Sequence, residues 1–150
     1  MVKKEVLQTG IIIMIQPESD LVHILMTTST RASLSDLADA FKNRGNIQVS
    51  WANSGAEALE KMPEGKFDLV ITDENLSDMT GIEFVGKLVM MNPMMNCIAV
   101  STLSPEDFHE ASEGLGILMQ LPPNPGQTEA NELLQYLDNV LTLTKNVKRD

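Results

Sequence analysis

One carboxylate stands at the end of an apolar run, where it could do chemistry. Residues 67–81 read FDLVITDENLSDMTG, so a strand-like run carries Asp73 to its end and Gly81 closes the acidic loop that follows. In parallel α/β sheets, ligands bind where the carboxyl ends of the strands splay apart. Aspartate is also common in turns and at helix caps, so its position alone is weak evidence. The elements around Asp73 must decide whether it is placed for chemistry.

Strand-like and helix-like segments alternate along the chain on both sides of Asp73. Most of the strand candidates are near-continuous apolar runs, which are typical of a parallel sheet covered on both faces. They span residues 22–27, 47–52, 67–72, 97–101 and 117–121. Five strand–helix units in one short chain predict an α/β fold, a doubly wound five-stranded parallel sheet with helices on both faces.

The helix starts are marked by capping pairs, in which a hydroxyl residue precedes an acid by three positions. Four such pairs occur: Ser33 with Asp36, Ser54 with Glu57, Thr80 with Glu83, and Ser104 with Asp107. The fifth helix is marked by apolar residues at helical spacing between Ala130 and Leu141. Each pair predicts that the hydroxyl side chain accepts a backbone N–H of the first helical turn.

The domain organisation follows from these elements. We expect one domain over residues 21–145, an N-terminal extension over 1–20 and a short tail over 146–150. The extension contains the strand-like run IIIMI (11–15). Three roles are open for this run: a sixth strand on the sheet edge, a strand lent to a partner subunit, or the true first strand of the domain. The third would leave the strand-like 22–27 inside a long connection, so it ranks last.

The composition limits the class of partner. The net charge is −10, which argues against nucleic acid or an anionic membrane surface as a binding partner. The chain has a single cysteine, Cys97, inside an apolar run, so no internal disulfide can form and a buried thiol is expected. This pattern favours a reducing, cytoplasmic location.

A family resemblance is carried by FDLVITDENLSDMTGIEF (67–84). This segment resembles the receiver domain of two-component response regulators, in which a phospho-accepting aspartate ends a hydrophobic strand and a glycine stands eight residues further on. Asp73 and Gly81 have that spacing, and NSGAEALE (53–60) is similar to the family's entry into its second helix. The resemblance covers about residues 21–145 and implies a flavodoxin-like fold and a role in phosphorelay signalling.

The metal site of the resembled family is only partly matched. In that family an acidic pair at the end of the first strand, the acceptor aspartate and a carbonyl two residues beyond it hold Mg²⁺. The matching positions are Thr28 and Ser29, which are both neutral, then Asp73, and Asn75, whose backbone carbonyl remains. We therefore expect no metal or other cofactor, and Asp73 would be the ligand if any Mg²⁺ bound. Reading IIIMI as the first strand ends it at Gln16, again without an acidic pair, although acids follow soon after.

The phosphoryl-binding groups of the resembled family are also incomplete. Ser101 fits the position of the hydroxyl residue at the end of the fourth strand. Leu121, directly before Pro122, stands where the family has a lysine. No lysine occurs between Lys87 and Lys145, so no shift of register supplies one. The resemblance also implies a cis peptide bond between Leu121 and Pro122.

These losses predict a degenerate receiver. Catalysis of phosphoryl transfer is mostly positioning and electrostatic stabilisation. One pair of unit charges 4 Å apart is worth about 4 kcal/mol at an effective dielectric of about 20, so losing a lysine and an acidic pair costs several such terms. We expect a stand-alone module that is not an enzyme and that acts by protein–protein contact without efficient phosphorylation. The alternative is an active receiver, phosphorylated on Asp73 by a histidine kinase with an atypical Mg²⁺ site.

The expected partner is another signalling protein, either a histidine kinase or a downstream effector. A homodimer is also possible, and by resemblance the contact surface lies within about residues 104–144. A third hypothesis, a small-ligand sensor, predicts an apolar cavity bordered by Thr28, Asp73, Ser101 and Leu121.

Overall fold

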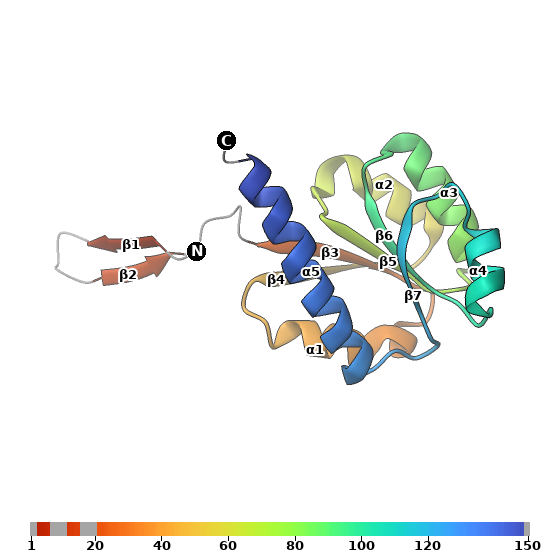
Figure 1. The fold of residues 1–150 in the computed structure, drawn as a ribbon, viewed down its shortest axis with the longest axis horizontal. Helices are drawn as coiled ribbons and strands as arrows, with labels where there is room; N and C mark the ends of the chain where they lie inside the picture. Colours follow the sequence, from red (N-terminus) through yellow and green to blue (C-terminus); the bar gives the residue numbers. More distant parts are fainter. Residues whose placement is uncertain (1–2, 7–11, 16–20, 149–150) are drawn as a thin grey trace.

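A computed structural model describes residues 3–6, 12–15 and 21–148 of the chain. Its main body is a five-stranded parallel sheet between two layers of helices (Figure 1). The strands are β3 (Val22–Thr27), β4 (Ile47–Ala52), β5 (Leu69–Thr72), β6 (Asn96–Val100) and β7 (Ile117–Leu121). Their order in the sheet is β4-β3-β5-β6-β7, which confirms the predicted doubly wound fold.

Four α-helices connect these strands, and a fifth follows β7. They are α1 (Ser35–Lys42), α2 (Gly55–Gly65), α3 (Gly81–Met91), α4 (Pro105–Ala111) and α5 (Gln127–Lys148), and a short 3₁₀ segment, η2 (Arg31–Leu34), precedes α1. Figure 1 shows α1 and α5 on one face of the sheet and α2, α3 and α4 on the other. In the described part of the chain, no helix combines the length and the apolar character needed to cross a membrane.

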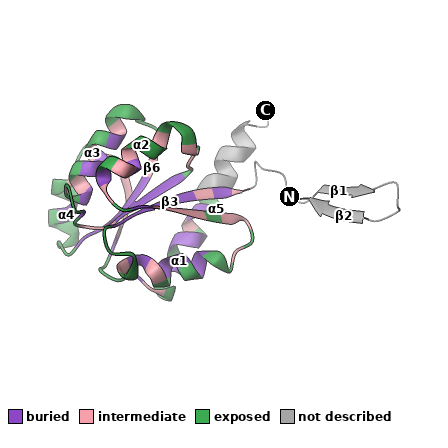
Figure 2. Ribbon diagram, turned by 180° about the vertical axis from the view of Figure 1, so that it is seen from behind, coloured by how far each residue is buried: buried purple, intermediate pink, exposed green. Residues whose placement is uncertain are grey.

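Each face of the sheet has its own apolar core, because successive side chains of a strand point to opposite faces. Ile24 and Met26 of β3 join the core under α1 and α5, whereas Leu25 joins the core under α2 and α3. The central strands β3, β5 and β6 are therefore buried on both sides, shown in purple in Figure 2, whereas the edge strands β4 and β7 are mostly half-buried. Cys97 lies in the second core, and burial raises the pKa of its thiol to about 12. This confirms the prediction of a buried thiol.

The N-terminal extension forms a hairpin of its own. Its strands β1 (Lys3–Val6) and β2 (Ile12–Ile15) pair antiparallel, with Val6 opposite Ile12. The expectation of a sixth strand in the main sheet is therefore wrong, and so is the reading of IIIMI as the domain's first strand. A nearby strand costs less loop-closure entropy to pair with than a distant sheet edge. The lent-strand role remains a prediction.

Three of the four predicted capping pairs are confirmed. Ser54, Thr80 and Ser104 each accept the backbone N–H three residues ahead. At Thr80 the Glu83 side chain also accepts the Thr80 N–H, which completes the capping box. Ser33 does not cap α1, which follows η2 without a side-chain cap. Its hydroxyl donates to Asp73 instead, as described below.

The prediction of a cis bond before Pro122 is wrong, because the described residues contain no cis peptide bond. The trans form is intrinsically preferred even before proline. The alignment of β7 does not depend on this bond, since the pairing of Val100 with Leu121 fixes the register of β7 against β6. The strands predicted at 67–72 and 97–101 are β5 and β6, with their bounds shifted by one or two residues.

Gly81 is required where α3 starts against the end of β5. A Cβ atom at Gly81 would collide with the backbone carbonyl oxygen of Asp73, whereas a Cβ at Gly86 in the middle of α3 would meet nothing within 4 Å. We expect Gly81→Ala to lower the free energy of unfolding by about 1–3 kcal/mol, because backbone atoms must move to make room. The measurement is urea unfolding followed by circular dichroism.

The matched control is Gly86→Ala, which adds the same methyl group in open space within the same helix. It should raise stability by about 0.5–1 kcal/mol, since alanine is the better helix former. Equal effects of the two substitutions would contradict the assigned role of Gly81.

Candidate functional site

Asp73 lies at the topological switch point of the sheet. At this point, between β3 and β5, the direction in which successive strands are added to the sheet reverses. Thr27 and Thr72 are register partners, and the Asp73 N–H continues this ladder by donating to the Thr27 carbonyl at 2.9 Å. This pairing brings the segment after β3 beside the segment after β5. The Asp73 side chain is half-buried there. This is the place where doubly wound sheets bind ligands.

The Asp73 carboxylate is held by two hydroxyl groups and one backbone amide. Oδ2 accepts hydrogen bonds from Thr28 Oγ1 at 2.8 Å and Ser33 Oγ at 2.5 Å. Oδ1 accepts the N–H of Glu74 at 2.9 Å. We call Thr28 and Ser33 the hydroxyl clasp. Hydrogen bonds to an ionised acceptor are short and strong, so the clasp fixes the orientation of the carboxylate.

The clasp hydroxyls have a second acceptor close by, the backbone carbonyl of Thr30. It lies 3.0 Å from Thr28 Oγ1 and 2.7 Å from Ser33 Oγ. Each hydroxyl carries a single proton, so Asp73 and the Thr30 carbonyl share the protons of the clasp. The Thr30 N–H in turn donates to Thr28 Oγ1 at 3.0 Å. The loop between β3 and α1 is therefore folded around the Asp73 carboxylate.

The structure brings only part of the predicted site together around Asp73. Thr28 contacts the carboxylate, whereas Ser29 is exposed and makes no side-chain hydrogen bond within the described residues. Asn75 is exposed in the next loop, where it forms a bridge with Thr80. Among the described residues no backbone donor reaches the Asn75 carbonyl, and its role as a metal ligand stays a prediction.

Ser101 and Leu121 end neighbouring strands, but neither side chain contacts Asp73 by a described hydrogen bond. The Ser101 N–H donates to the Leu121 carbonyl at 3.0 Å. The Ser101 hydroxyl accepts the N–H of Leu103 at 3.1 Å, inside its own loop. Leu121 is 2% exposed and packs in the core under α1 and α5. At this position an apolar side chain completes the core where the resembled family places a cation.

Glu74 lies beside Asp73 in the chain, but its side chain binds another loop. Its Oε2 accepts both the N–H and the hydroxyl of Thr102, at 2.7 and 3.0 Å. The Glu74 carboxylate is thus tied to the loop between β6 and α4.

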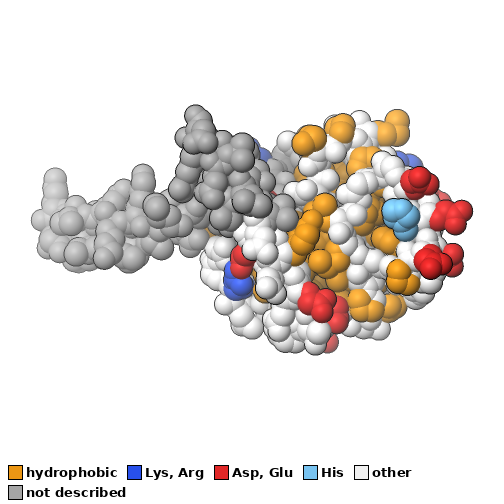
Figure 3. Space-filling model, in the orientation of Figure 1, with side chains coloured by type: hydrophobic (Ala, Val, Ile, Leu, Met, Phe, Trp, Pro, Cys, Tyr) orange, Lys and Arg blue, Asp and Glu red, His pale blue; other side chains and the backbone are white. Residues whose placement is uncertain are grey.

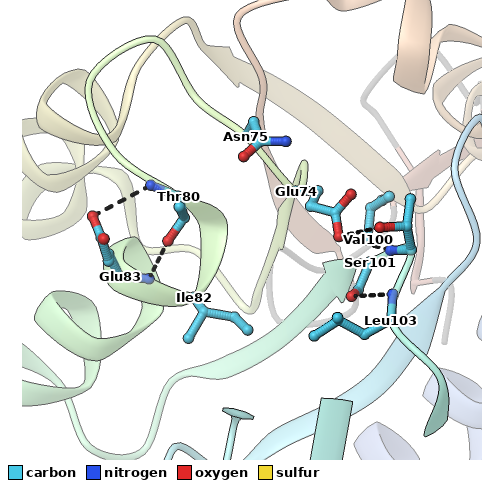
Figure 4. A pocket seen from close by; sticks show the side chains of 9 residues that line it. Glu74, Asn75, Thr80, Ile82, Glu83, Val100, Ser101 and Leu103 are labelled. Atoms are coloured by element: carbon cyan, nitrogen blue, oxygen red, sulfur yellow. Dashed lines mark hydrogen bonds between the residues drawn. The ribbon is translucent and has the colours of Figure 1, made fainter. Parts of the chain in front are cut away.

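An open pocket of about 560 Å³ lies between the β5–α3 loop with the first turn of α3 on one side and the β6–α4 loop on the other. Its lining includes Glu74, Asn75, Ser101 and Leu103 (Figure 4). Neither Thr28, Asp73 nor Leu121 lines it, so this pocket is not the cavity that the small-ligand hypothesis predicts.

The residues at Asp73 do not fit a Mg²⁺ site of the kind that the resemblance implies. Mg²⁺ is usually held by one or two carboxylates in octahedral geometry. One oxygen of Asp73 already accepts two hydroxyls, the positions of the acidic pair are neutral, and Glu74 is bound to Thr102. Within the part of the chain that the structure describes, no three His, Cys, Asp or Glu side chains gather as metal ligands.

Comparison with known proteins decides the family. The model of the response regulator receiver domain matches residues 24–121, most of the chain. The chain belongs to the response regulator receiver family. It is therefore a receiver domain of two-component signalling, and the order of its strands agrees with this assignment.

The receiver is similar to several known proteins. It is 29% identical over 98 residues to a response regulator receiver protein of Anaeromyxobacter sp. (strain Fw109-5), covering 65% of this chain and 41% of that protein. It is 37% identical over 60 residues to the transcriptional regulatory protein ZraR of Klebsiella oxytoca, covering 40% of this chain and 14% of ZraR. The matches thus span well under two thirds of these relatives.

Solved structures share the fold at low identity. A CheY-like receiver domain protein from Methanospirillum hungatei JF-1 superposes with a TM-score of 0.70 and 24% identity, over 84% of this chain and 98% of that chain. The chemotaxis response regulator CheY4 of Vibrio cholerae gives a TM-score of 0.69 and 21% identity, over 78% and 98%.

Sequence reasoning missed two residues of the site. Ser33 was predicted as a helix cap and instead donates to Asp73, and Thr102 was not singled out although it holds Glu74. A signal for the first exists in the sequence: TTSTRAS (27–33) is rich in hydroxyls and follows the strand next to that of Asp73. No comparable pattern marks Thr102.

Asp78 anchors the loop after Asp73 to the start of α2. Its two carboxylate oxygens accept the N–H groups of Gly55 and Ala56, each at 2.9 Å. These bonds to Ala56 and Gly55 lower the pKa of Asp78. A lowered pKa in the folded state stabilises the fold at pH values above the unfolded pKa of about 3.9, and this stabilisation is lost as the pH falls through the folded pKa.

We therefore expect Asp78→Ala to be less stable than the wild type at pH 7, and the difference to disappear as the pH falls below about 4. The measurement is urea unfolding at a series of pH values. Glu60→Ala is the matched control, because it removes an exposed acid from α2, the helix whose first N–H groups Asp78 binds. A stability difference for Asp78→Ala that persists unchanged at low pH would contradict this role of the Asp78 carboxylate.

Proposed function

We propose that this receiver acts as a pseudo-receiver: it transmits its signal through contact with a signalling protein and is not efficiently phosphorylated on Asp73. The observation that carries the proposal is the hydroxyl clasp. Thr28 and Ser33 give Asp73 neutral hydrogen-bond donors, where phosphoryl transfer needs cations. In this role the domain is a binding module and not an enzyme.

The charge balance around Asp73 supports the proposal. A phosphorylated side chain carries a charge of about −1.5 to −2 near pH 7. Ion pairs of the described residues lie elsewhere, at Lys42–Asp39, Arg44–Asp138 and Lys61–Glu57. None of these pairs includes Asp73, and Leu121 stands where the family has the lysine that would offset a phosphoryl group. Each missing pair at about 4 Å is worth about 4 kcal/mol at an effective dielectric of about 20.

The surface around α4, β7 and α5 is the contact region that we propose. β7 is an edge strand, and its residues 117–120 are half-buried. Figure 3 shows apolar side chains gathered between α5 and α4, with acidic side chains toward α4. The first turn of α4 contributes Glu106 and Asp107. A partner with an apolar strip and a basic rim would complement this surface, whether it is a histidine kinase, an effector or a second receiver.

The alternative, an active receiver, is distinguished by its response to phosphoryl donors. With Mg²⁺ and acetyl phosphate or beryllofluoride, we expect mass spectrometry to show no adduct on Asp73 and amide NMR shifts to stay unchanged. Asp73→Asn is the control. An adduct of ordinary occupancy that disappears in Asp73→Asn would refute the pseudo-receiver proposal and establish that the domain is an active receiver.

Restoring the acidic pair tests the same idea in the opposite direction. We expect Thr28→Asp combined with Ser29→Asp to be destabilised without metal, because three carboxylates would then repel one another. Mg²⁺ should recover stability, by about 1.4 kcal/mol at a concentration ten times its Kd, whereas the wild type should not respond. The measurement is Tm against Mg²⁺ concentration.

Thr28 is fully buried, so the double variant could fail to fold. Ser29→Asp alone changes an exposed residue and serves as the second variant, with a smaller response expected. A wild type that already gains stability with millimolar Mg²⁺ would count against the proposal.

A further inference from the structure

We propose that Glu74 is a built-in latch, which holds the β6–α4 loop in one arrangement while Asp73 carries no phosphoryl group. The latch is the contact between the Glu74 carboxylate and Thr102. It concerns regulation of the same site and rests on the proposed function in one respect, that no phosphoryl group on Asp73 competes for this loop.

The first support is the geometry of the contact. One oxygen, Glu74 Oε2, accepts two donors from the same residue, the Thr102 N–H at 2.7 Å and the Thr102 hydroxyl at 3.0 Å. Bonds in which one partner is ionised are shorter and stronger than neutral ones, and two donors from one residue fix its position as well as its distance. Glu74 as a residue is half-buried, but both bonds lie on the exposed side of the molecule, so solvent screens part of its charge.

The second support is that the loop is tied from the opposite side as well. Gln120 of β7 donates through Nε2 to the Leu103 carbonyl at 2.8 Å and to the Ser101 carbonyl at 3.4 Å. The Ser101 hydroxyl accepts the Leu103 N–H within the loop. Residues 101–103 are thus held between an acceptor from the β5 side and a donor from β7. All three backbone N–H groups of this segment are bonded within the protein, while the Ser101 hydroxyl keeps its proton.

The third support is what the loop positions. Ser104 caps α4 by accepting the Asp107 N–H, so α4 starts directly after the latched segment. Fixing Thr102 therefore fixes the beginning of α4 and one wall of the pocket (Figure 4). Helix α4 borders the surface proposed above as the contact region. The latch would present that surface in a constant form.

The fourth support is that residue 74 connects the latch to Asp73. The Glu74 N–H donates to Asp73 Oδ1, and the Glu74 side chain binds Thr102. Two loops and the clasped carboxylate are thus joined through one residue. The negative charge that reaches the β6–α4 loop comes from a permanent side chain and needs no covalent modification.

The test is amide hydrogen exchange of Thr102, measured by NMR on the full chain. In Glu74→Ala we expect the Thr102 amide to exchange roughly tenfold faster or more, because its charged acceptor is gone. Amide shifts of residues 101–108 should move as well. Glu132→Ala is the matched control, since it removes an exposed acid on α5 and the same unit of charge. It should leave Thr102 unchanged.

Two variants of the partner residue keep the test sharp if Glu74→Ala disturbs the fold. Thr102→Val removes the hydroxyl donor and keeps the backbone donor, so we expect an intermediate rise in exchange. Thr102→Ser keeps both donors and should behave like the wild type. If Thr102 exchanges at the same rate in the wild type and in Glu74→Ala, or if valine and serine behave alike, the latch is refuted.

Beryllofluoride separates this outcome from failure of the proposed function. Added to the wild type with Mg²⁺, it should leave the Thr102 amide shift unchanged. A shift that depends on Asp73 would overturn the pseudo-receiver reading, while the Glu74→Ala comparison made without beryllofluoride would still decide whether the latch exists.

Discussion

The pairing of β3 with β5 is the constraint on which the site depends. Placing Thr27 beside Thr72 brings two chain segments, 45 residues apart at Thr28 and Asp73, to the same edge of the sheet. A half-buried carboxylate at that edge must find donors, because an unpaired charge away from water is costly. Neutral hydroxyls of the β3–α1 loop meet that need here. The site is consequently closed on itself, with the acid, its donors and the loop geometry all supplied by one chain.

The other acids of the β5–α3 loop are also bound by donors within the protein. Asp73 is bound by the clasp, Glu74 by Thr102 and Asp78 by the first amides of α2. Three successive acids of one loop therefore find their partners inside the protein, among hydroxyls and backbone N–H groups. In a chain with a net charge of −10, these internal donors satisfy the acids of the loop.

Several particular elements were predictable because their signals are local. The strand boundaries of β3 and β7 follow from apolar runs, those of β4 follow from the alternation in IQVSWA, and Thr80 with Glu83 marks the start of α3. The position of Asp73 at a strand end follows from the run before it. Ser33 was misassigned because its spacing to Asp36 is that of a cap, and only the approach of Asp73 offers it a stronger, charged acceptor. The prediction of a cis bond before Pro122 came from the resemblance alone. Here the residue before the proline is Leu121, where the family has a lysine, and the bond is trans.

The sequence by itself determined the fold class, the place of Asp73 at a strand end and the uncharged residue types at Thr28, Ser29 and Leu121, since these depend on residue types and on periods along the chain. The tertiary structure alone decided which side chains contact Asp73 and Glu74. Whether Thr28 and Ser33 point at Asp73, and whether Glu74 turns toward Thr102, depends on contacts between loops far apart in sequence. No pattern along the chain encodes such directions, because hydroxyl and carboxylate side chains have several acceptors and donors within reach, and the packed sheet selects among them.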